Sequence, residues 1–236
     1  MGTKSKRILN GLLLISIVSI TYFLNLDIPL YIFCIIAVLY DIFYSKIIDY
    51  SSLVRFSFLL IISSLFFFLI PYHLVFFIFI FLFLFNFYSK IYLKDFFIIS
   101  LSFFFFCVSD IYSIDRSYIY IIIFLSFLND TVAYFFGNLL KGPLIIPQIS
   151  PNKTWSGSII SSLISLFFII FFFDFNIFYS FILSISFFFG DIYFSYFKRQ
   201  FAIKDYSNLI PGHGGLLDRI DSMFLANIFL LFLLNI

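Results

Sequence analysis

The stretch "SIISSLISLFFIIFFFDFNIFYSFILSISFFFGDIYFSY", residues 158–196, decides the fold class. It consists of two long apolar runs, 158–173 and 175–196, which a single charged residue, Asp174, separates. A helix needs about 20 apolar residues to cross the hydrocarbon core of a bilayer. Because runs of this kind recur along the whole chain, the sequence predicts an all-α, polytopic integral membrane protein.

The composition favours the same class. Of 236 residues, 63% are hydrophobic and only 11% are charged, whereas about 25% of the residues in an average soluble domain are charged. The chain therefore lacks the polar surface that a water-soluble domain needs. Its two cysteines, Cys34 and Cys107, lie inside apolar runs without a CxxC motif or a nearby His. This placement favours buried, unreactive thiols over a disulfide or a zinc site.

Charges, prolines and asparagines divide the chain into about nine candidate spans, and eight is the alternative number. The first run has the basic flank of a signal peptide, but no small-residue cleavage site follows it, so we expect a retained span. The candidate spans are 8–24, 28–44, 54–70, 72–89, 96–112, 117–136, 158–173, 175–196 and 222–236.

The basic residues predict the orientation of these spans. If the N-terminus lies in the cytoplasm, all Lys and Arg residues except Arg116 fall in cytoplasmic segments. Arg116 lies in an outer turn beside Asp110 and Asp115. Because cytoplasmic loops carry an excess of Lys and Arg, we expect a cytoplasmic N-terminus. The polar clusters that could carry chemistry then face the cytoplasm as well.

There are three such clusters: residues 129–143 with Asp130, residues 149–157, and a stretch from Gly190 to Asp221. The third begins with Asp191, in "FFFGDIYFSYFKR" (residues 187–199) near the end of an apolar run. On a continuous helix Ser195 follows one turn later on the same face, and Lys198 lies one turn further. An ionised Asp this close to hydrocarbon needs a partner. The partner is either a bound cation, such as a metal ion, or a local Lys in an interfacial ion pair.

The third cluster continues through "KDYSNLIPGHGGLLDRIDSM", residues 204–223, as far as Asp221. Asp218 and Asp221 are spaced i, i+3, so both carboxylates can project from one helix face, although capping alone also favours acids at a helix start. The preceding Pro and Gly residues prevent helix and let backbone N–H groups approach an anion. Lys204 and Arg219 add positive charge suited to phosphate. Oxygen ligands without Cys favour Mg²⁺ over zinc.

Two further features are less specific. His213 is a lone loop His, which is more often structural than a catalytic base. Lys153 and Thr154 in "SPNKTWSG" (residues 150–157) fit a phosphate-binding patch before a helix, but a basic flank is also expected at a cytoplasmic span end. The clusters together predict Mg²⁺-dependent chemistry on a phosphate-bearing substrate at the cytoplasmic membrane surface.

The stretch "SYFKRQFAIKDYSNLIPGHGGLLDRID", residues 195–221, resembles the pattern of the phosphatidate cytidylyltransferases, also called CDP-diacylglycerol synthases. "DTVAYFFG" (residues 130–137) and "SPNKTWSG" resemble upstream segments of that family in the right order. The resemblance covers the C-terminal half, from about Asn129. The matching residues of the main motif are Ser195, Lys198, Arg199, Lys204, Asp205, Pro211, His213, Gly214, Gly215, Asp218, Arg219 and Asp221.

The resemblance implies an activity, partners and a location. The family transfers CMP from CTP to phosphatidate, which yields CDP-diacylglycerol and pyrophosphate in phospholipid biosynthesis. The implied cofactor is Mg²⁺, and whether a monovalent cation joins it is left open. The implied partners are CTP, phosphatidate and the lipid bilayer, without nucleic acid, and a homodimer is left open. The implied location is a bacterial-type inner (plasma) membrane, with the active site facing the cytoplasm.

The resemblance also implies a role for each matching residue. A single membrane domain, 1–236, would hold N-terminal spans in 1–116 and a catalytic half in 117–236. Ser156 stands where relatives usually carry an acid, so no residue of this chain is assigned the role of that acid. The implied metal ligands are Asp191, Asp218, Asp221 and Asp130, of which the first three are also catalytic together with His213. The implied substrate-binding residues are Lys153, Thr154, Ser195, Lys198, Arg199, Lys204, Gly214, Gly215 and Arg219.

Two alternatives belong to other classes of function. A CTP-dependent lipid kinase of the dolichol kinase type would transfer the γ-phosphate of CTP, but the H-G-G and D-R-x-D pattern favours the cytidylyltransferase. A channel or transporter would carry paired charges in the middle of its spans, whereas these charges cluster at the cytoplasmic ends.

Overall fold

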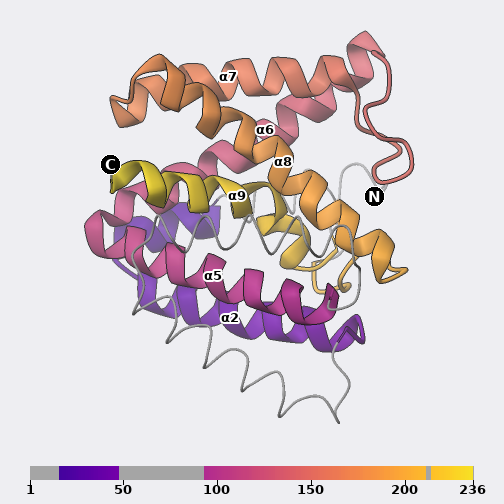
Figure 1. Ribbon diagram of the computed structural model, residues 1–236. Coiled ribbons are helices and arrows are strands. Elements are labelled where there is room, and N and C mark those ends of the chain that lie inside the picture. Colours follow the sequence, from indigo (N-terminus) through magenta and orange to yellow (C-terminus); the bar gives the residue numbers. More distant parts are fainter. Residues whose placement is uncertain (1–15, 48–92, 211–213, 236) are drawn as a thin grey trace. The chain divides into compact units, whose positions relative to one another are not determined.

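The computed structural model describes residues 16–47, 93–210 and 214–235 (Figure 1). Within these ranges the regular structure is α-helical, beginning with a helical stretch at residues 16–24. The same ranges contain no strand, only the isolated antiparallel bridges Leu144–Thr154 and Ile210–Gly214. The named helices are α2 (Asp27–Tyr44), α5 (Leu93–Ile114), α6 (Arg116–Leu140), α7 (Trp155–Phe173), α8 (Ile177–Gln200) and α9 (Leu217–Leu234).

Five helices, α2, α5, α6, α7 and α8, are long and apolar enough to cross a membrane. Each lies within a few residues of a predicted span, which confirms the all-α, polytopic fold class. The predicted spans 54–70 and 72–89 lie outside the described residues, so the number of spans, nine or eight, stays a prediction. Helix α9 begins at Leu217, ahead of the predicted span 222–236, and therefore includes Asp218 and Asp221.

The ends of two helices have clear local causes. Asp115 caps α6 with its side chain, and α6 ends at Lys141, whose φ of 46° is left-handed. Thr154 caps α7 by accepting the N–H of Gly157 at 3.3 Å, and α7 ends at Asp174 with a φ of 51°. A residue in this conformation cannot continue a right-handed helix. The chain therefore leaves α6 and α7 abruptly, and residues 174–176 alone connect α7 to α8.

The chain divides into two compact units. The smaller unit comprises residues 1–49 and 198–221, and the larger unit comprises residues 50–197 and 222–236. The domain organisation expected from the sequence, one membrane domain with a catalytic half from residue 117, stays a prediction.

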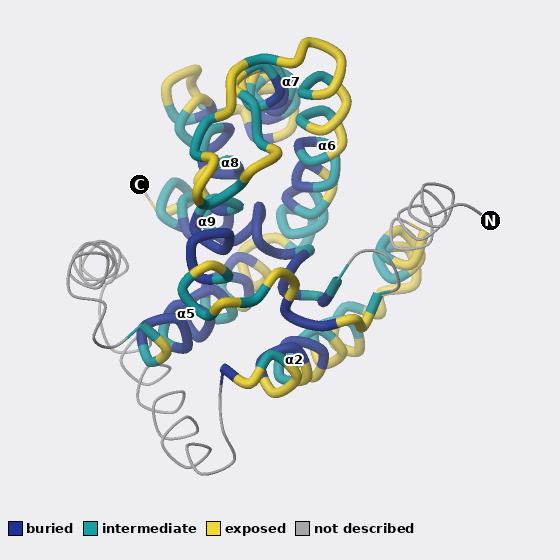
Figure 2. Tube along the Cα trace, turned by 90° about the vertical axis from the view of Figure 1, so that its right-hand side faces the viewer, coloured by how far each residue is buried: buried dark blue, intermediate teal, exposed yellow. Residues whose placement is uncertain are grey.

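The core of the larger unit is aromatic. Phe97 of α5, Phe194 of α8 and Phe224 of α9 are each 0% exposed. The Phe97 and Phe194 rings meet edge to face with centroids 5.7 Å apart, as do Phe194 and Phe224 at 5.3 Å. Tyr193 stacks on Phe224 at 4.9 Å. Offset and edge-to-face geometries are the favoured ones for aromatic pairs, so these rings join α5, α8 and α9. Figure 2 colours the backbone of these helices by how far each residue is buried.

Helices α6 and α7 of the same unit pack closely through small residues. Gly157 of α7 faces α6, where an added Cβ would collide with the carbonyl oxygen of Ala133 and lie 3.1 Å from the Cα of Gly137. Further along, the buried Ser165 hydroxyl donates to the side-chain oxygen of Asn129 at 3.4 Å. Small residues and interhelical hydrogen bonds of this kind are typical of packing between membrane helices.

Replacement of Gly157 tests this close approach. We expect Gly157→Ala to lower the free energy of unfolding by about 1–3 kcal/mol, because the new methyl group must displace the α6 backbone. Thermal unfolding of the detergent-solubilised protein, followed by helical circular dichroism, measures the loss. Ser158→Ala, at the next and half-exposed position, is the control. An unchanged midpoint in Gly157→Ala would contradict the packing described.

Candidate active site

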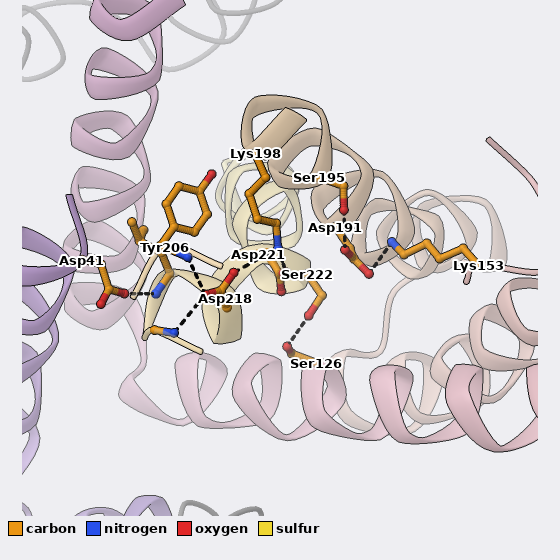
Figure 3. Close-up of polar contacts among 12 residues, drawn as sticks. Asp41, Ser126, Lys153, Asp191, Ser195, Lys198, Tyr206, Asp218, Asp221 and Ser222 are labelled. Carbon is orange, nitrogen blue, oxygen red and sulfur yellow. Dashed lines mark hydrogen bonds and ion pairs between the residues drawn. The ribbon is translucent and has the colours of Figure 1, made fainter. Parts of the chain in front are cut away.

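Lys198, Asp218 and Asp221 form a buried charged cluster in the smaller unit (Figure 3). Asp218 and Asp221 are only 6% and 7% exposed. The Nζ atom of Lys198 lies 3.0 Å from Oδ1 of Asp218 and 3.9 Å from Oδ2 of Asp221. The two acids are one helical turn apart at the start of α9, and their shared partner shows that both carboxylates project to one side of that helix.

The second oxygen of Asp218 joins two parts of the backbone, at residues 206 and 215. It accepts the N–H of Tyr206 and the N–H of Gly215, each at 2.9 Å. Gly214 has a φ of 80°, and an added Cβ there would lie 2.6 Å from this same oxygen. Residue 214 must therefore be Gly for its conformation and for its surroundings. The backbone thus approaches a carboxylate of the chain itself, and its predicted contact with a bound anion stays a prediction.

Asp41, near the end of α2, is a third buried carboxylate of the smaller unit, and it was not predicted from the sequence. It is 0% exposed. Its Oδ1 accepts the hydroxyl of Ser207 at 2.5 Å and its Oδ2 accepts the N–H of Leu217 at 2.7 Å. An added Cβ on Gly215 would collide with this carboxylate. The signal was present in the sequence, because an acid inside an apolar span marks a candidate functional residue by default.

In the larger unit, Asp191 of α8 obtains its positive partner from another helix. Its Oδ2 pairs with the Nζ atom of Lys153, which precedes α7, and its Oδ1 lies 3.4 Å from the hydroxyl of Ser195 one turn further along α8. The same Nζ atom lies 5.7 Å from the centre of the Phe188 ring, within reach of a cation–π interaction. The segment 150–157 of the family resemblance therefore meets the predicted site residue Asp191 in one ion pair.

The segment before α7 is held by its own hydroxyl groups. The Thr154 hydroxyl caps α7 and lies 3.3 Å from that of Ser156. Ser156 in turn accepts the N–H of Gly142 at 3.3 Å. Thr154 is thus a helix cap in this structure, and its predicted contact with substrate stays a prediction. Ser156, which stands where relatives usually carry an acid, has a structural hydrogen bond of its own.

The other predicted site residues are less enclosed. Lys204 and Arg199 are exposed, and Arg219 and Asp130 are partly exposed. His213 lies outside the described residues, so its role as a catalytic residue stays a prediction.

The predicted metal site remains a prediction as well. Among the residues that the structure describes, no group of three or more His, Cys, Asp or Glu side chains gathers closely enough to hold a metal ion. Asp218 and Asp221 supply two of the predicted oxygen ligands and lie together, whereas Asp191 and Asp130 belong to the other unit.

The fold and these clusters define a class of protein. Several membrane-length helices with buried acids and lysines at their ends make a polytopic all-α membrane protein. The chain belongs to the cytidylyltransferase family, whose model matches residues 5–236.

Two groups of bacterial relatives are similar to the chain. The phosphatidate cytidylyltransferase of Staphylococcus haemolyticus is 46% identical over 118 residues, which cover 46% of this chain and 44% of the relative. That of Rickettsia conorii is 40% identical over 122 residues, which cover 45% of this chain and 53% of the relative. The matched part thus spans about half the length of these curated relatives. No solved structure matches the chain.

Removal of the positive charge from the smaller unit's cluster tests its energetic role. We expect Lys198→Met to lower the free energy of unfolding by about 3 kcal/mol, because it leaves two buried acids without this partner. Denaturant titration of the solubilised protein measures the loss. Lys94→Met, which removes an exposed Lys of α5, should have little effect. Equal stability of the two variants would show that the contact between Lys198 and Asp218 contributes little.

Proposed function

We propose that the protein is a phosphatidate cytidylyltransferase, which transfers CMP from CTP to phosphatidate and yields CDP-diacylglycerol and pyrophosphate. Membership of the cytidylyltransferase family supports this proposal. So do the names of the staphylococcal and rickettsial relatives, each a phosphatidate cytidylyltransferase. The sequence pattern of residues 195–221 supports it independently.

The observation that carries the proposal is the buried cluster of Lys198, Asp218 and Asp221. Lys198 belongs to the first part of the resemblance and the two acids to its last part, and the fold brings them within ion-pair distance. Buried charges are unfavourable unless they are paired. Lys198 supplies positive charge that can neutralise phosphate, and the two carboxylates can hold a cation that does the same.

The reaction needs positioning and charge neutralisation more than a protein nucleophile. A phosphate oxygen of phosphatidate forms a bond to the α-phosphorus of CTP. The bond from that phosphorus to the oxygen bridging the α- and β-phosphates breaks, and its electron pair leaves with pyrophosphate. We assign the binding of the phosphate groups to the basic residues Lys153, Lys198, Arg199, Lys204 and Arg219.

The same proposal includes Mg²⁺. Asp218 and Asp221 fit a divalent cation because they offer carboxylate oxygens on one side of α9, and oxygen ligands are those that Mg²⁺ prefers. Asp191 and Asp130 are the further ligands that we propose. When bound, the ion supplies positive charge to the phosphate groups. The residues of the chain hold the ligand oxygens in place, Asp218 through the N–H groups of Tyr206 and Gly215.

Position-specific labels test the activity. With purified protein and phosphatidate vesicles, we expect label from [α-³²P]CTP to enter the lipid and label from [γ-³²P]CTP to appear in pyrophosphate. This follows because the α,β-bridging bond is the one that breaks. Thin-layer chromatography of the extracted lipid and of the aqueous phase measures the label in the lipid and in pyrophosphate. Label from the γ position in the lipid would instead identify a lipid kinase, and no label from either position would reject both activities.

Substitution of the acids tests the site. We expect Asp218→Asn and Asp191→Asn each to reduce the labelling rate about 100-fold or more, because a neutral amide is a poorer ligand than a carboxylate for the proposed Mg²⁺. Asp174→Asn is the matched control, since Asp174 is exposed and left-handed and Asn tolerates that conformation. A near-normal rate in either variant, with normal membrane insertion, would remove that acid from the proposed site.

Cysteine labelling tests the proposed cytoplasmic location of the site. In a background with Cys34 and Cys107 replaced by Ala, we expect Asn152→Cys to react with a membrane-impermeant maleimide only after the cells are opened. Ser113→Cys, near Arg116, should react in intact cells, because the Lys and Arg distribution places that turn outside. Both positions are exposed. The reverse pattern would invert the predicted orientation.

A further inference from the structure

We propose that Asp41 is a positioning residue for the reaction, which holds the start of α9 and residues 206–208 in the geometry that Asp218 and Asp221 need. The inference rests on the proposed function, because it assigns to Asp41 a role in that same site. It differs from the family resemblance, which begins near Asn129 and assigns nothing to Asp41.

The geometry is a pair of carboxylates that tie the same two segments together. Asp218 accepts the N–H groups of Tyr206 and Gly215. Asp41 accepts the hydroxyl of Ser207 and the N–H of Leu217, the neighbours of those segments. Each acid thus bridges residues 206–207 to residues 215–217. The two acids and their four donors all belong to the smaller unit.

The link from Asp41 to the candidate active site is short. Leu217 is the first residue of α9 and precedes Asp218 directly. The hydrogen bond at Leu217 therefore sets the direction in which the side chains of Asp218 and, one turn later, Asp221 project from the helix. Ser207 follows Tyr206, whose N–H binds Asp218. Asp41 therefore acts on Asp218 through two neighbouring residues: Leu217, which precedes Asp218, and Ser207, which follows its donor Tyr206.

Other contacts of α2 support a positioning role. The hydroxyl of Tyr44, one turn after Asp41, accepts the side-chain N–H of Asn208 at 3.1 Å. The Ser207 hydroxyl that donates to Asp41 also accepts the N–H of Leu209 at 3.1 Å. Helix α2 thus binds the consecutive residues Ser207 and Asn208. Since ionised acids are unfavourable in an apolar span, an apolar residue would serve better at position 41 if packing were its only task.

Two variants of Asp41 separate positioning from simple stability. Asp41→Ala removes both hydrogen bonds, and we expect the kcat of the folded enzyme to fall about 10- to 100-fold with KM for phosphatidate unchanged, because the acids of α9 are displaced. Asp41→Asn can still accept the N–H of Leu217 and can donate to Ser207, so we expect it to recover kcat to within about threefold. Asp27→Ala, at the other end of α2, is the control.

A readout independent of activity completes the test. In nanodiscs of the full chain, Asp41→Ala should accelerate hydrogen exchange in peptides covering residues 204–221, because Leu217 loses its acceptor. Peptides of α6 should exchange as in the wild type. If Asp41→Ala fails to insert, Ser207→Ala removes one of the two hydrogen bonds and should give a smaller change in the same direction, with Ser45→Ala as its control.

The outcomes keep the inference and the proposed function apart. A wild-type protein that makes no CDP-diacylglycerol rejects the proposed function, whatever the exchange data show. An active wild type with full kcat in Asp41→Ala overturns the inference alone. So does an equal loss of kcat in Asp41→Asn and Asp41→Ala, or unchanged exchange at residues 204–221. Loss of kcat in Asp41→Ala, recovery in Asp41→Asn and faster exchange together support it.

Discussion

A carboxylate removed from water must find hydrogen-bond donors or a cation within the protein, and this requirement organises the polar part of the chain. Asp218 meets it with Lys198 and two backbone N–H groups. Asp41 meets it with a hydroxyl and a backbone N–H, and Asp191 with Lys153 and Ser195. Because these donors come from separate segments, satisfying the acids also fixes where those segments lie.

Much of the fold could be predicted from the sequence, because the length and polarity of a run determine whether it can span a bilayer. The bounds of α5 to α8 fell within a few residues of the prediction, since charged and Pro residues mark the ends of apolar runs. The start of α9 was placed too late, because Asp218 and Arg219 appear polar in sequence although they lie in its first turn. The aromatic core could not be predicted: with 42 Phe residues in the chain, only packing distinguishes Phe97 or Phe224 from the others.

The candidate site was partly predictable. Asp191, Asp218 and Lys198 stood out because charge is rare in this chain and because their spacing follows a family pattern. The pairing of Lys153 with Asp191 was not predictable, since it depends on how the segment before α7 returns to α8. Asp41 was missed because it lies among apolar residues with no other polar group of the motif nearby in sequence. Its partners, Ser207 and Leu217, are 166 and 176 residues away along the chain.

That separation has a consequence for biosynthesis. A ribosome makes α2 long before it makes Ser207 and Leu217, and domains acquire their contacts as the chain emerges. Until then the Asp41 carboxylate sits in a nascent helix without the two donors that it has in the finished protein. The smaller unit can therefore close only after Leu217 has been made, and synthesis arrested before Ser207 would leave this acid without either donor.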